Sequence, residues 1–397
     1  MAASTQAILS LADEIKSLAT EESTSPSGAR HVQLLQRVDE LKLAIESPTD
    51  TILRLIYQPP QNAALRTVID LGIFPLLVES KSGVSAAELE ERTGAERGLI
   101  VRLMRVMAGL GLCASHESEV YSPTDKTLAM TQPIGRDGVS CLFDLVVPTL
   151  SKLPEYLRLH NYSNPKEYSR SPMQWAVGKS QFEWMNEHKE QQTTFNSYMS
   201  SRREGKPSWF DVYPIESLIQ EAVPCAEMPF IVDVGGNQGH DLAKLRDRYP
   251  NHPGRLILQD LPKIVAPVDR PGIETMGYSF LDPQPVKGAL AYYFRAIFHD
   301  WPDHICQKIL LNTISAMDPK YSRILIVDWV LPDTKAPLLQ SSMDIQMMSI
   351  GAGVERSERQ WRELLGGAGL EIKQIHNSHP GMESIIEAVR IGSEASA

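Results

Sequence analysis

Residues 229–250 decide the fold, and they read Pro-Phe-Ile-Val-Asp-Val-Gly-Gly-Asn-Gln-Gly-His-Asp-Leu-Ala-Lys-Leu-Arg-Asp-Arg-Tyr-Pro. Residues 230–234 are a short apolar run rich in β-branched side chains, which is typical of a buried parallel strand. Three glycines follow, and then two leucines at helical spacing: Gly235, Gly236, Gly239, Leu242 and Leu245. A strand, a glycine turn and a helix make the first half of a nucleotide-binding βαβ unit, in which the ligand lies against bare backbone.

Two acidic residues near this turn indicate which nucleotide it binds. Asp233 stands just before the first glycines, where its carboxylate would repel a pyrophosphate and suit a ligand with a cationic amine. The next predicted strand, residues 255–259, ends on Asp260, and an acid at that strand tip suits a ribose diol. An ammonium group and a ribose in one ligand indicate S-adenosylmethionine. The alternative is a glycine turn flanked by two solvated acids that bind no ligand.

The whole chain is acidic and long for a single domain. Its length of 397 residues favours two domains. Its net charge of −10, without a basic block, argues against nucleic acid as a substrate. It has no apolar run of about twenty residues, so we expect no membrane span. Its first twenty residues lack a basic segment followed by an apolar run, so we expect no secretory signal. The cysteines are scattered through the chain: Cys113, Cys141, Cys225 and Cys306. They lack metal-site spacing, so a reduced, cytoplasmic setting is the simplest expectation.

Residues 1–125 are predicted to form a helical domain. Four apolar residues near the start lie at helical spacing: Ile8, Leu11, Ile15 and Leu18. A Ser/Pro-rich break at 23–28 precedes one or two amphipathic helices over 32–57, which Pro59-Pro60 should end. Another helix is predicted over 63–77, interrupted by Gly72.

Residues 84–122 have the pattern of a winged helix. Ser85 and Glu88 form a capping pair for a helix that ends at Gly94, a second helix covers 96–112, and residues 113–122 indicate a hairpin. A winged helix is often a DNA reader, and this second helix carries arginines at three positions: Arg97, Arg102 and Arg105. We favour a dimerisation role, because the chain is acidic and a catalytic-looking domain follows.

Residues 126–228 are predicted to be a helical linker region that contributes to a substrate pocket. Helices over 148–162 and 171–199 carry bulky side chains: Trp175, Phe182, Trp184, Met185, Phe195, Tyr198 and Met199. These side chains are core, or they line a pocket for a flat, apolar substrate, and we expect both uses for different residues. Arg202 and Arg203 are a solvated pair or face an acidic group of a substrate, and we favour the solvated pair.

Strand and helix patterns alternate from residue 229 to 397. Seven strands are predicted, at 230–234, 255–259, 273–278, 290–297, 323–329, 371–375 and 384–389, with the last two as a pair. Helices are predicted at 305–317 and 358–365. The fold class is therefore α/β, with a doubly wound sheet whose binding site lies beyond the carboxyl ends of the strands.

A histidine on the same edge of this sheet is a candidate general base. His299 follows the fourth strand, and its ordinary pKa is near neutrality. Asp328 ends the fifth strand and Glu355 lies in a later loop, so either acid could orient the imidazole. The alternatives are a surface histidine, or a metal site made of neighbouring residues: His299, Asp300, Asp303 and His304. We favour no metal, because four residues this close in one loop rarely converge.

Five motifs in this order resemble one enzyme family. They are Asp-Val-Gly-Gly-x-x-Gly, Gln-Asp-Leu-Pro, Pro-Gln-Pro, His-Asp-Trp-x-Asp and Glu-Arg-Ser-Glu. The chain is similar over almost its whole length to the fungal small-molecule O-methyltransferases, relatives of the plant caffeic acid and flavonoid enzymes. The resemblance implies a Rossmann-like class I methyltransferase domain, residues 229–397, preceded by an α-helical winged-helix domain that forms a homodimer. It also implies S-adenosylmethionine as the cofactor.

The resemblance also implies roles for individual residues. His299 matches the catalytic base, with Asp328 and Glu355 as its flanking acids. The cofactor residues that match are Gly235, Asp260, Leu261, Ser279, Phe280 and Arg295, the last in place of a family lysine at the edge of the adenine. The residues expected at the acceptor are Phe195, Met199, Trp301, Met343 and Met347. Two positions depart from the family: Asn237 replaces a third glycine, where asparagine tolerates left-handed angles, and Ser279 replaces an aspartate.

The sequence therefore predicts methyl transfer to a phenol or enol hydroxyl of an aromatic or polyketide-type metabolite, with His299 as general base. Relatives in this family that bind the cofactor without methylating, and guide a dehydration or pericyclic ring closure instead, provide the main alternative. The complete set of His299, Asp328 and Glu355 favours methyl transfer, whereas Ser279 and the unusual glycine turn favour the alternative. A DNA-binding regulator is a third hypothesis, and it leaves the histidine and the acids unexplained.

Overall fold

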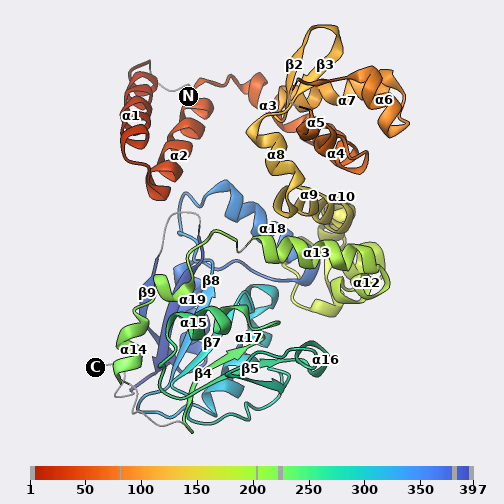
Figure 1. Cartoon of the computed structure of the whole chain (residues 1–397). Helices are drawn as coiled ribbons and strands as arrows, with labels where there is room; N and C mark the ends of the chain where they lie inside the picture. The colour runs from red at the N-terminus through yellow and green to blue at the C-terminus, as the bar shows by residue number, and fades with distance from the viewer. Residues whose placement is uncertain (1–4, 81, 203, 222–226, 378–381, 393–397) are drawn as a thin grey trace. The chain divides into compact units, whose positions relative to one another are not determined.

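The computed structural model describes residues 5–80, 82–202, 204–221, 227–377 and 382–392. The chain forms two compact units, Met1–Ser151 with Phe182–Gly205, and Lys152–Gln181 with Lys206–Ala397. The helices and strands of both are drawn in Figure 1. The domain boundaries expected at residues 125 and 228 stay a prediction. No helix in the described ranges is both long and apolar enough to cross a membrane.

The second unit is built on one seven-stranded sheet. Its strands are β4 (Pro229–Val234), β5 (Arg255–Asp260), β6 (Ile273–Gly277), β7 (Ala291–Arg295), β8 (Arg323–Asp328), β9 (Leu370–His376) and β10 (Ser384–Arg390). The spatial order is β6-β5-β4-β7-β8-β10-β9, with β9 at one side in Figure 1. Strands β4 to β8 pair in parallel, and β10 runs antiparallel to both of its neighbours. The predicted α/β class and all seven strands are confirmed.

Helices cover both faces of this sheet. On β8, Ile324 and Ile326 belong to the core that contains α17 (Asp303–Ile314) and α19 (Glu358–Gly367). The alternate residues Leu325 and Val327 belong to the opposite core, with α14 (Ile215–Glu221), α15 (His240–Arg248) and α16 (Pro262–Val265). Because both faces are buried, the central strands β4, β7 and β8 are buried at nearly every position, whereas the edge strands β6 and β9 carry several exposed polar residues.

Two further helices of this unit pack on one another. They are α11 (Pro172–Val177) and α18 (Leu338–Gly351), and α18 was not predicted. Short helical turns lie at η3 (Tyr168–Arg170), η4 (Trp209–Asp211) and η5 (Phe298–Asp300). Helices α10 (Val147–Leu159) and α12 (Gln181–Glu187) each contain a boundary between the two units.

The first unit is mainly helical. It contains α1 (Thr5–Thr24), α2 (Gly28–Ile45), α3 (Pro48–Ile56), α4 (Gln58–Asp70), α5 (Ile73–Glu79), α6 (Ala86–Thr93), α7 (Arg97–Gly109), α8 (Asp125–Thr131), α9 (Pro133–Cys141), a π-helix (Leu142–Val146) and α13 (Lys189–Ser201). Strands β1 (Val84–Ser85), β2 (Ala114–His116) and β3 (Val120–Ser122) form a small sheet. The predicted capping pair is present, since Ser85 and Glu88 cap α6 reciprocally. The helix–turn–helix and hairpin of the predicted winged helix are therefore confirmed.

Two helical stretches predicted in this part of the chain each consist of several helices. The stretch over 32–57 is α2 and α3, and it ends at Tyr57, just before Pro59 and Pro60, as predicted. Both prolines lie in the first turn of α4, where the missing amide hydrogens cost no intrahelical bond. The predicted helix over 171–199 is three helices, because Gly178 adopts a left-handed conformation that ends α11, and His188 separates α12 from α13.

Helices α1 to α3 expose much of their apolar surface. None of the residues that the structure describes in them is buried. The large exposed apolar side chains from Leu9 to Tyr57 are Leu9, Leu35, Val38, Leu43, Ile45, Ile52, Leu53, Leu55, Ile56 and Tyr57. Apolar helix surface of this extent is typical of a protein–protein interface.

Candidate active site

The glycine turn between β4 and α15 leaves its backbone bare. Gly235 has a φ of 76°, and a Cβ there would lie 2.6 Å from Cδ1 of Ile297. A Cβ on Gly236 would lie 2.4 Å from a carboxylate oxygen of Asp233. Asn237 has a φ of 53°, so asparagine does adopt the left-handed angle expected of it. The packing of Ile297 and Asp233 against the turn therefore requires glycine at positions 235 and 236.

Asp260 joins this turn to the tip of β5. Its Oδ2 accepts a hydrogen bond of 2.9 Å from the backbone amide of Asn237, and its Oδ1 accepts one of 2.7 Å from Leu261. The carboxylate is therefore fixed in orientation beside the glycine turn, and each oxygen keeps a lone pair for a further donor. This arrangement fits the ribose diol of the expected cofactor.

The other residues expected at the cofactor lie in different surroundings. Phe280 is next to the turn, since its ring lies 3.7 Å from the position of a Cβ on Gly235. Leu261 is 45% exposed, and Ser279 Oγ accepts a long hydrogen bond of 3.3 Å from the amide of Leu281. These three residues lie on the loops that follow β5 and β6.

Arg295 is held by two carboxylates. Its NH1 donates to Oδ1 of Asp241 at 3.1 Å, and its NH2 donates to Oε2 of Glu383 at 2.8 Å. Asp241 lies in the first turn of α15, and it also accepts a hydrogen bond of 3.1 Å from the hydroxyl of Tyr293. Arg295 therefore ties the helix after the glycine turn to the segment before β10, and its expected place at the adenine stays a prediction.

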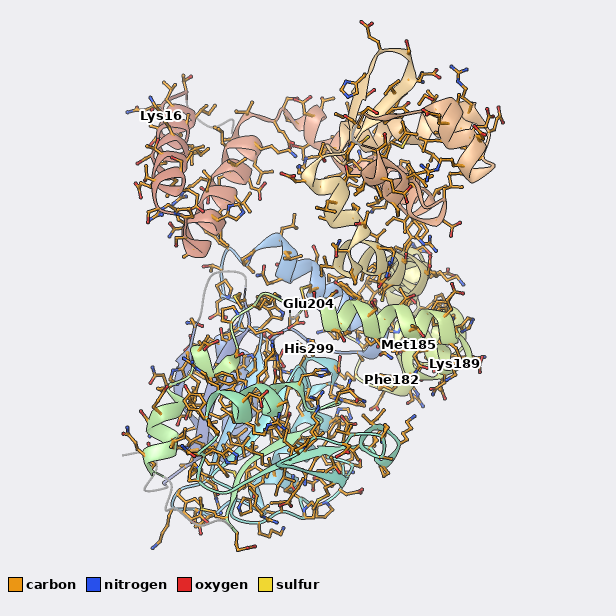
Figure 2. The ribbon with its side chains drawn as sticks, in the orientation of Figure 1. Lys16, Phe182, Met185, Lys189, Glu204 and His299 are labelled. Carbon is orange, nitrogen blue, oxygen red and sulfur yellow. The ribbon has the colours of Figure 1, made fainter. Side chains whose placement is uncertain are left out.

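The structure brings the predicted histidine and its two acids together. His299 lies in η5 beyond the end of β7, and Figure 2 marks it at this edge of the sheet. Its Nδ1 lies 2.8 Å from Oε1 of Glu355 and 3.8 Å from Oδ1 of Asp328. The side chains of Asp328 and Glu355 are 2% and 0% exposed, and that of His299 is 14% exposed. One imidazole edge is therefore fixed against two buried carboxylates.

A third carboxylate, which the sequence suggested only as a metal ligand, faces the other imidazole edge. Oδ1 of Asp300 lies 3.7 Å from Nε2 of His299. Burial alone would lower the pKa of the imidazole, but the neighbouring carboxylates outweigh burial and raise the pKa of His299 to about 10. Burial also raises the pKa of Asp328, to about 7. The site therefore binds protons more strongly than the same groups do in water.

Backbone contacts hold the two loops of this cluster together. The amide of Val354 donates to the carbonyl of His299 at 2.9 Å, and the amide of Glu355 donates to Oδ1 of Asp344 at 2.8 Å. A Cβ on Gly353 would lie 2.2 Å from the carbonyl oxygen of His299, so this approach requires glycine. Oδ2 of Asp328 and Oε2 of Glu355 are buried and have no hydrogen-bond partner within the described ranges.

The alternative metal site is not assembled. Asp303 is bound by Arg356, and His304 is 52% exposed and lies 3.9 Å from Glu167. His299, Asp328 and Glu355 do have ligand atoms within 4.8 Å of one another. Because Nδ1 of His299 already hydrogen-bonds Glu355 at 2.8 Å, we interpret this group as a hydrogen-bonded cluster.

The acceptor residues predicted in the second unit are one tryptophan in an aromatic group and two methionines on α18. The ring of Trp301 lies 5.3 Å from that of Tyr168 and 6.1 Å from that of Phe280. Met347 is buried and Met343 is half-buried, both on α18. These side chains are apolar and polarizable, as a flat acceptor requires.

Two of the predicted acceptor residues belong to the first unit. Phe195 and Met199 lie on α13, and their contact with the acceptor stays a prediction. Arg202 lies over the ring of Tyr198 at 5.7 Å, whereas Arg203 lies outside the described residues. Among the bulky residues of this region, Met185 is buried and Phe182 is 51% exposed, so the set is mixed as expected.

Comparisons with known proteins identify the family. Residues 162–371 match the O-methyltransferase domain, and residues 59–132 match the O-methyltransferase dimerisation domain. Demethylsterigmatocystin 6-O-methyltransferase of Aspergillus flavus is 35% identical over 369 residues, which cover 92% of this chain and 94% of that protein.

Two solved structures resemble the chain equally well. A structure described as a pericyclic reaction enzyme has a TM-score of 0.86 and 31% identity, and it covers 96% of this chain and 100% of its own. The structure of LepI in complex with SAM has the same TM-score and identity and covers 96% of this chain and 99% of its own. The chain belongs to the O-methyltransferase family, as the resemblance of its motifs implied.

Proposed function

We propose that the chain transfers a methyl group to a hydroxyl of an aromatic or polyketide-type secondary metabolite. The observation that carries the proposal is the geometry of the His299 imidazole: Glu355 engages Nδ1 at 2.8 Å, whereas Asp300 lies 3.7 Å from Nε2. Family membership supports methyl transfer as the reaction, and the relative named demethylsterigmatocystin 6-O-methyltransferase supports a hydroxyl oxygen as the acceptor.

In this mechanism Nε2 of His299 takes the proton of the acceptor hydroxyl. S-Adenosylmethionine, when bound, would supply the methyl group from its sulfonium and leave as S-adenosylhomocysteine. Glu355 keeps the Nδ1 proton in place and Asp328 stabilises the imidazolium that forms. The pKa of His299 is about 10 without ligands, so proton transfer from the acceptor to the imidazole is favourable. The same pKa means that only a small fraction of His299 is neutral near pH 7.

Residues at the ends of β4 to β7 would hold the cofactor. We assign the methionine end to the bare backbone of Gly235, the ribose to Asp260, and the adenine surroundings to Leu261, Ser279 and Phe280, with Arg295 nearby. The bare glycine turn and the fixed carboxylate of Asp260 support this assignment. Within the second unit, we assign the acceptor surroundings to Trp301, Met343 and Met347.

A non-methylating pericyclase or dehydratase is the second candidate. The similarity to a pericyclic reaction enzyme, at a TM-score of 0.86, supports it. The intact set of His299, Asp328 and Glu355 favours methyl transfer, because a ring closure does not need a general base.

The same proposal includes a homodimer formed through the N-terminal domain, in a cytoplasmic setting. The dimerisation domain at 59–132 and the exposed apolar side chains of α1 to α3 support the dimer. Light scattering of the full chain tests it: a mass of twice 44.2 kDa is expected, and a monomer at micromolar concentration would contradict it.

The reaction is tested by following S-adenosylhomocysteine while the purified protein meets a panel of phenolic and polyketide-derived acceptors. Turnover with at least one acceptor is expected, at a rate proportional to enzyme. Acceptor consumption without any S-adenosylhomocysteine would favour the pericyclase.

A further inference from the structure

Arg356 is a buried cation that binds the turn carrying His299. It is the residue after Glu355 and is 1% exposed. Its NH1 donates to the carbonyl of Phe298 at 2.9 Å, and its NH2 donates to the carbonyl of Trp301 at 2.9 Å. These two carbonyls lie on either side of His299 in the η5 turn. One guanidinium therefore holds both ends of the turn that carries the base.

The main chain of the same residue holds a third segment. The amide of Leu331 donates to the carbonyl of Arg356 at 2.9 Å, and Leu331 and Ser357 form an isolated bridge. Leu331 lies three residues after Asp328. Arg356 thus contacts the segments that carry His299 and Asp328, and it is covalently joined to Glu355.

The geometry of the guanidinium explains why arginine occupies this position. Its remaining donors bind Oδ1 of Asp303 at 3.0 Å from Nε and 2.7 Å from NH2, and this is its one carboxylate partner among the described residues. The planar fork reaches two carbonyls and one carboxylate at once, which a lysine ammonium at the end of a flexible stem does not reproduce. The thiol of Cys306 also contacts the carbonyls of Phe298 and Trp301, each at 3.3 Å.

We propose that Arg356 is a positioning residue that fixes His299 against Glu355, so that Nδ1 stays engaged and Nε2 stays available to the acceptor. The inference rests on the proposed methyl transfer for its effect on rate, but its effect on the His299–Glu355 contact is independent of that reaction. Arg356 acts through His299, since its donors are used by the protein itself.

The test compares R356Q and R356K with R359Q in the full-length protein. The side chain of Arg359 is 71% exposed, and its ion pair with Asp333 is long, at 3.7 Å, so R359Q is a matched control. We expect R356Q to lower kcat about 100-fold, R356K to lower it less, and R359Q to leave it unchanged, because a shift of about 1 Å at a reacting group costs about that factor. Affinity for S-adenosylhomocysteine should stay within twofold in all three variants.

NMR titration of His299 distinguishes a positioning role of Arg356 from a general effect on stability, and it does not require turnover. The pKa of His299, followed by NMR of its imidazole, should fall in R356Q towards the ordinary value, because Glu355 no longer holds the ring. If the folded fraction of R356Q keeps the wild-type kcat and the wild-type His299 titration, the proposal is wrong, whatever the thermal stability. If R356Q does not fold, R356K carries the same test. A wild-type protein that never methylates, with a His299 titration that still shifts in the variants, would overturn the proposed function and leave this inference standing.

Discussion

Strand β8 has a buried charged cluster at each end, and the two clusters differ in charge balance. At the start of the strand, Arg323 donates to Glu387 at 3.0 Å and also binds Glu221, while His376 lies 3.4 Å from Glu387. At the end of the strand, Asp328 joins Glu355 and Asp300 around the imidazole of His299. We refer to these as the Arg323 cluster and the His299 cluster.

The difference shows in the acidic groups. Burial raises the pKa of Glu387, but the hydrogen bond to His376 and the charge of Arg323 outweigh burial and keep the pKa below its usual range. In the His299 cluster, three carboxylates face one imidazole, and the pKa of Asp328 rises to about 7. In the Arg323 cluster, removal of one partner leaves an unpaired buried charge and should destabilise the fold. In the His299 cluster, the excess of carboxylates retains protons whose transfer can be used in a reaction.

Substitution of His299 should distinguish the two clusters most clearly. H299N removes the proton acceptor, so we expect kcat to fall about 10³-fold, within the range for general bases, while S-adenosylhomocysteine affinity changes less than threefold. Steady-state kinetics and calorimetry measure the two effects. The matched variant H376N alters the other cluster and should retain the wild-type kcat; equal losses in both variants would contradict the distinction.

Loss of a carboxylate from the balanced cluster should affect stability instead. E387Q removes the shared partner of Arg323 and His376, and we expect the free energy of unfolding to fall by about 3 kcal/mol. Urea unfolding measures this change. The control E358Q breaks an exposed pair with Arg362 and should cost less than about 0.5 kcal/mol. A change in kcat of folded E387Q would show that the clusters are coupled.

Loss of a carboxylate from the His299 cluster should move the pH dependence. In the wild type, the rate should rise with pH through neutrality, since the proposed base is the neutral imidazole and the pKa of His299 is about 10. D328N removes the largest contribution that raises this pKa, so the acidic limb should move to lower pH. The plateau should fall about tenfold for each pKa unit lost, because one unit is about 1.4 kcal/mol of stabilisation of the imidazolium. An acidic limb that stays in place would contradict this electrostatic account.

The smallest expected effect concerns the glycine turn. Asn237 has a φ of 53°, so N237G should keep cofactor affinity within twofold and change stability by less than about 1 kcal/mol. N237V places a β-branched residue at the same angle, and we expect a cost of about 1–2 kcal/mol together with weaker binding. Calorimetry with S-adenosylhomocysteine compares the pair. Similar affinities in both would show that the turn tolerates strain.

Much of the sheet and of the site could be predicted because the signals are local. The apolar runs of β4 to β8 and the glycine turn are continuous in the sequence, and parallel strands place their carboxyl ends at one edge. This rule predicted that His299 and Asp328 share one edge of the sheet, and the later loop with Glu355 was expected at the same edge; the structure brings all three side chains together.

The remaining features depend on contacts between distant segments. The amide of Glu355 binds Asp344 on α18, and Arg356 binds the carbonyls beside His299, yet neither contact has a sequence pattern of its own. The engagement of Arg295 by Asp241 and Glu383 joins residues far apart in the chain. The sequence of α18 does contain a helical pattern, because apolar residues recur every four positions at Leu339, Met343 and Met347. This pattern is short, and the polar residues between its members obscure it.

Transfer of a labelled methyl group tests the account most directly. Wild type and H299N are incubated with S-adenosylmethionine that carries a deuterated methyl group and with the acceptor panel, and the products are analysed by mass spectrometry. We predict a product that contains the labelled methyl from the wild type and a rate about 10³-fold lower from H299N, although both proteins bind S-adenosylhomocysteine. An unlabelled, isomerised or dehydrated product from the wild type, or labelled product at equal rates from both proteins, would contradict the account.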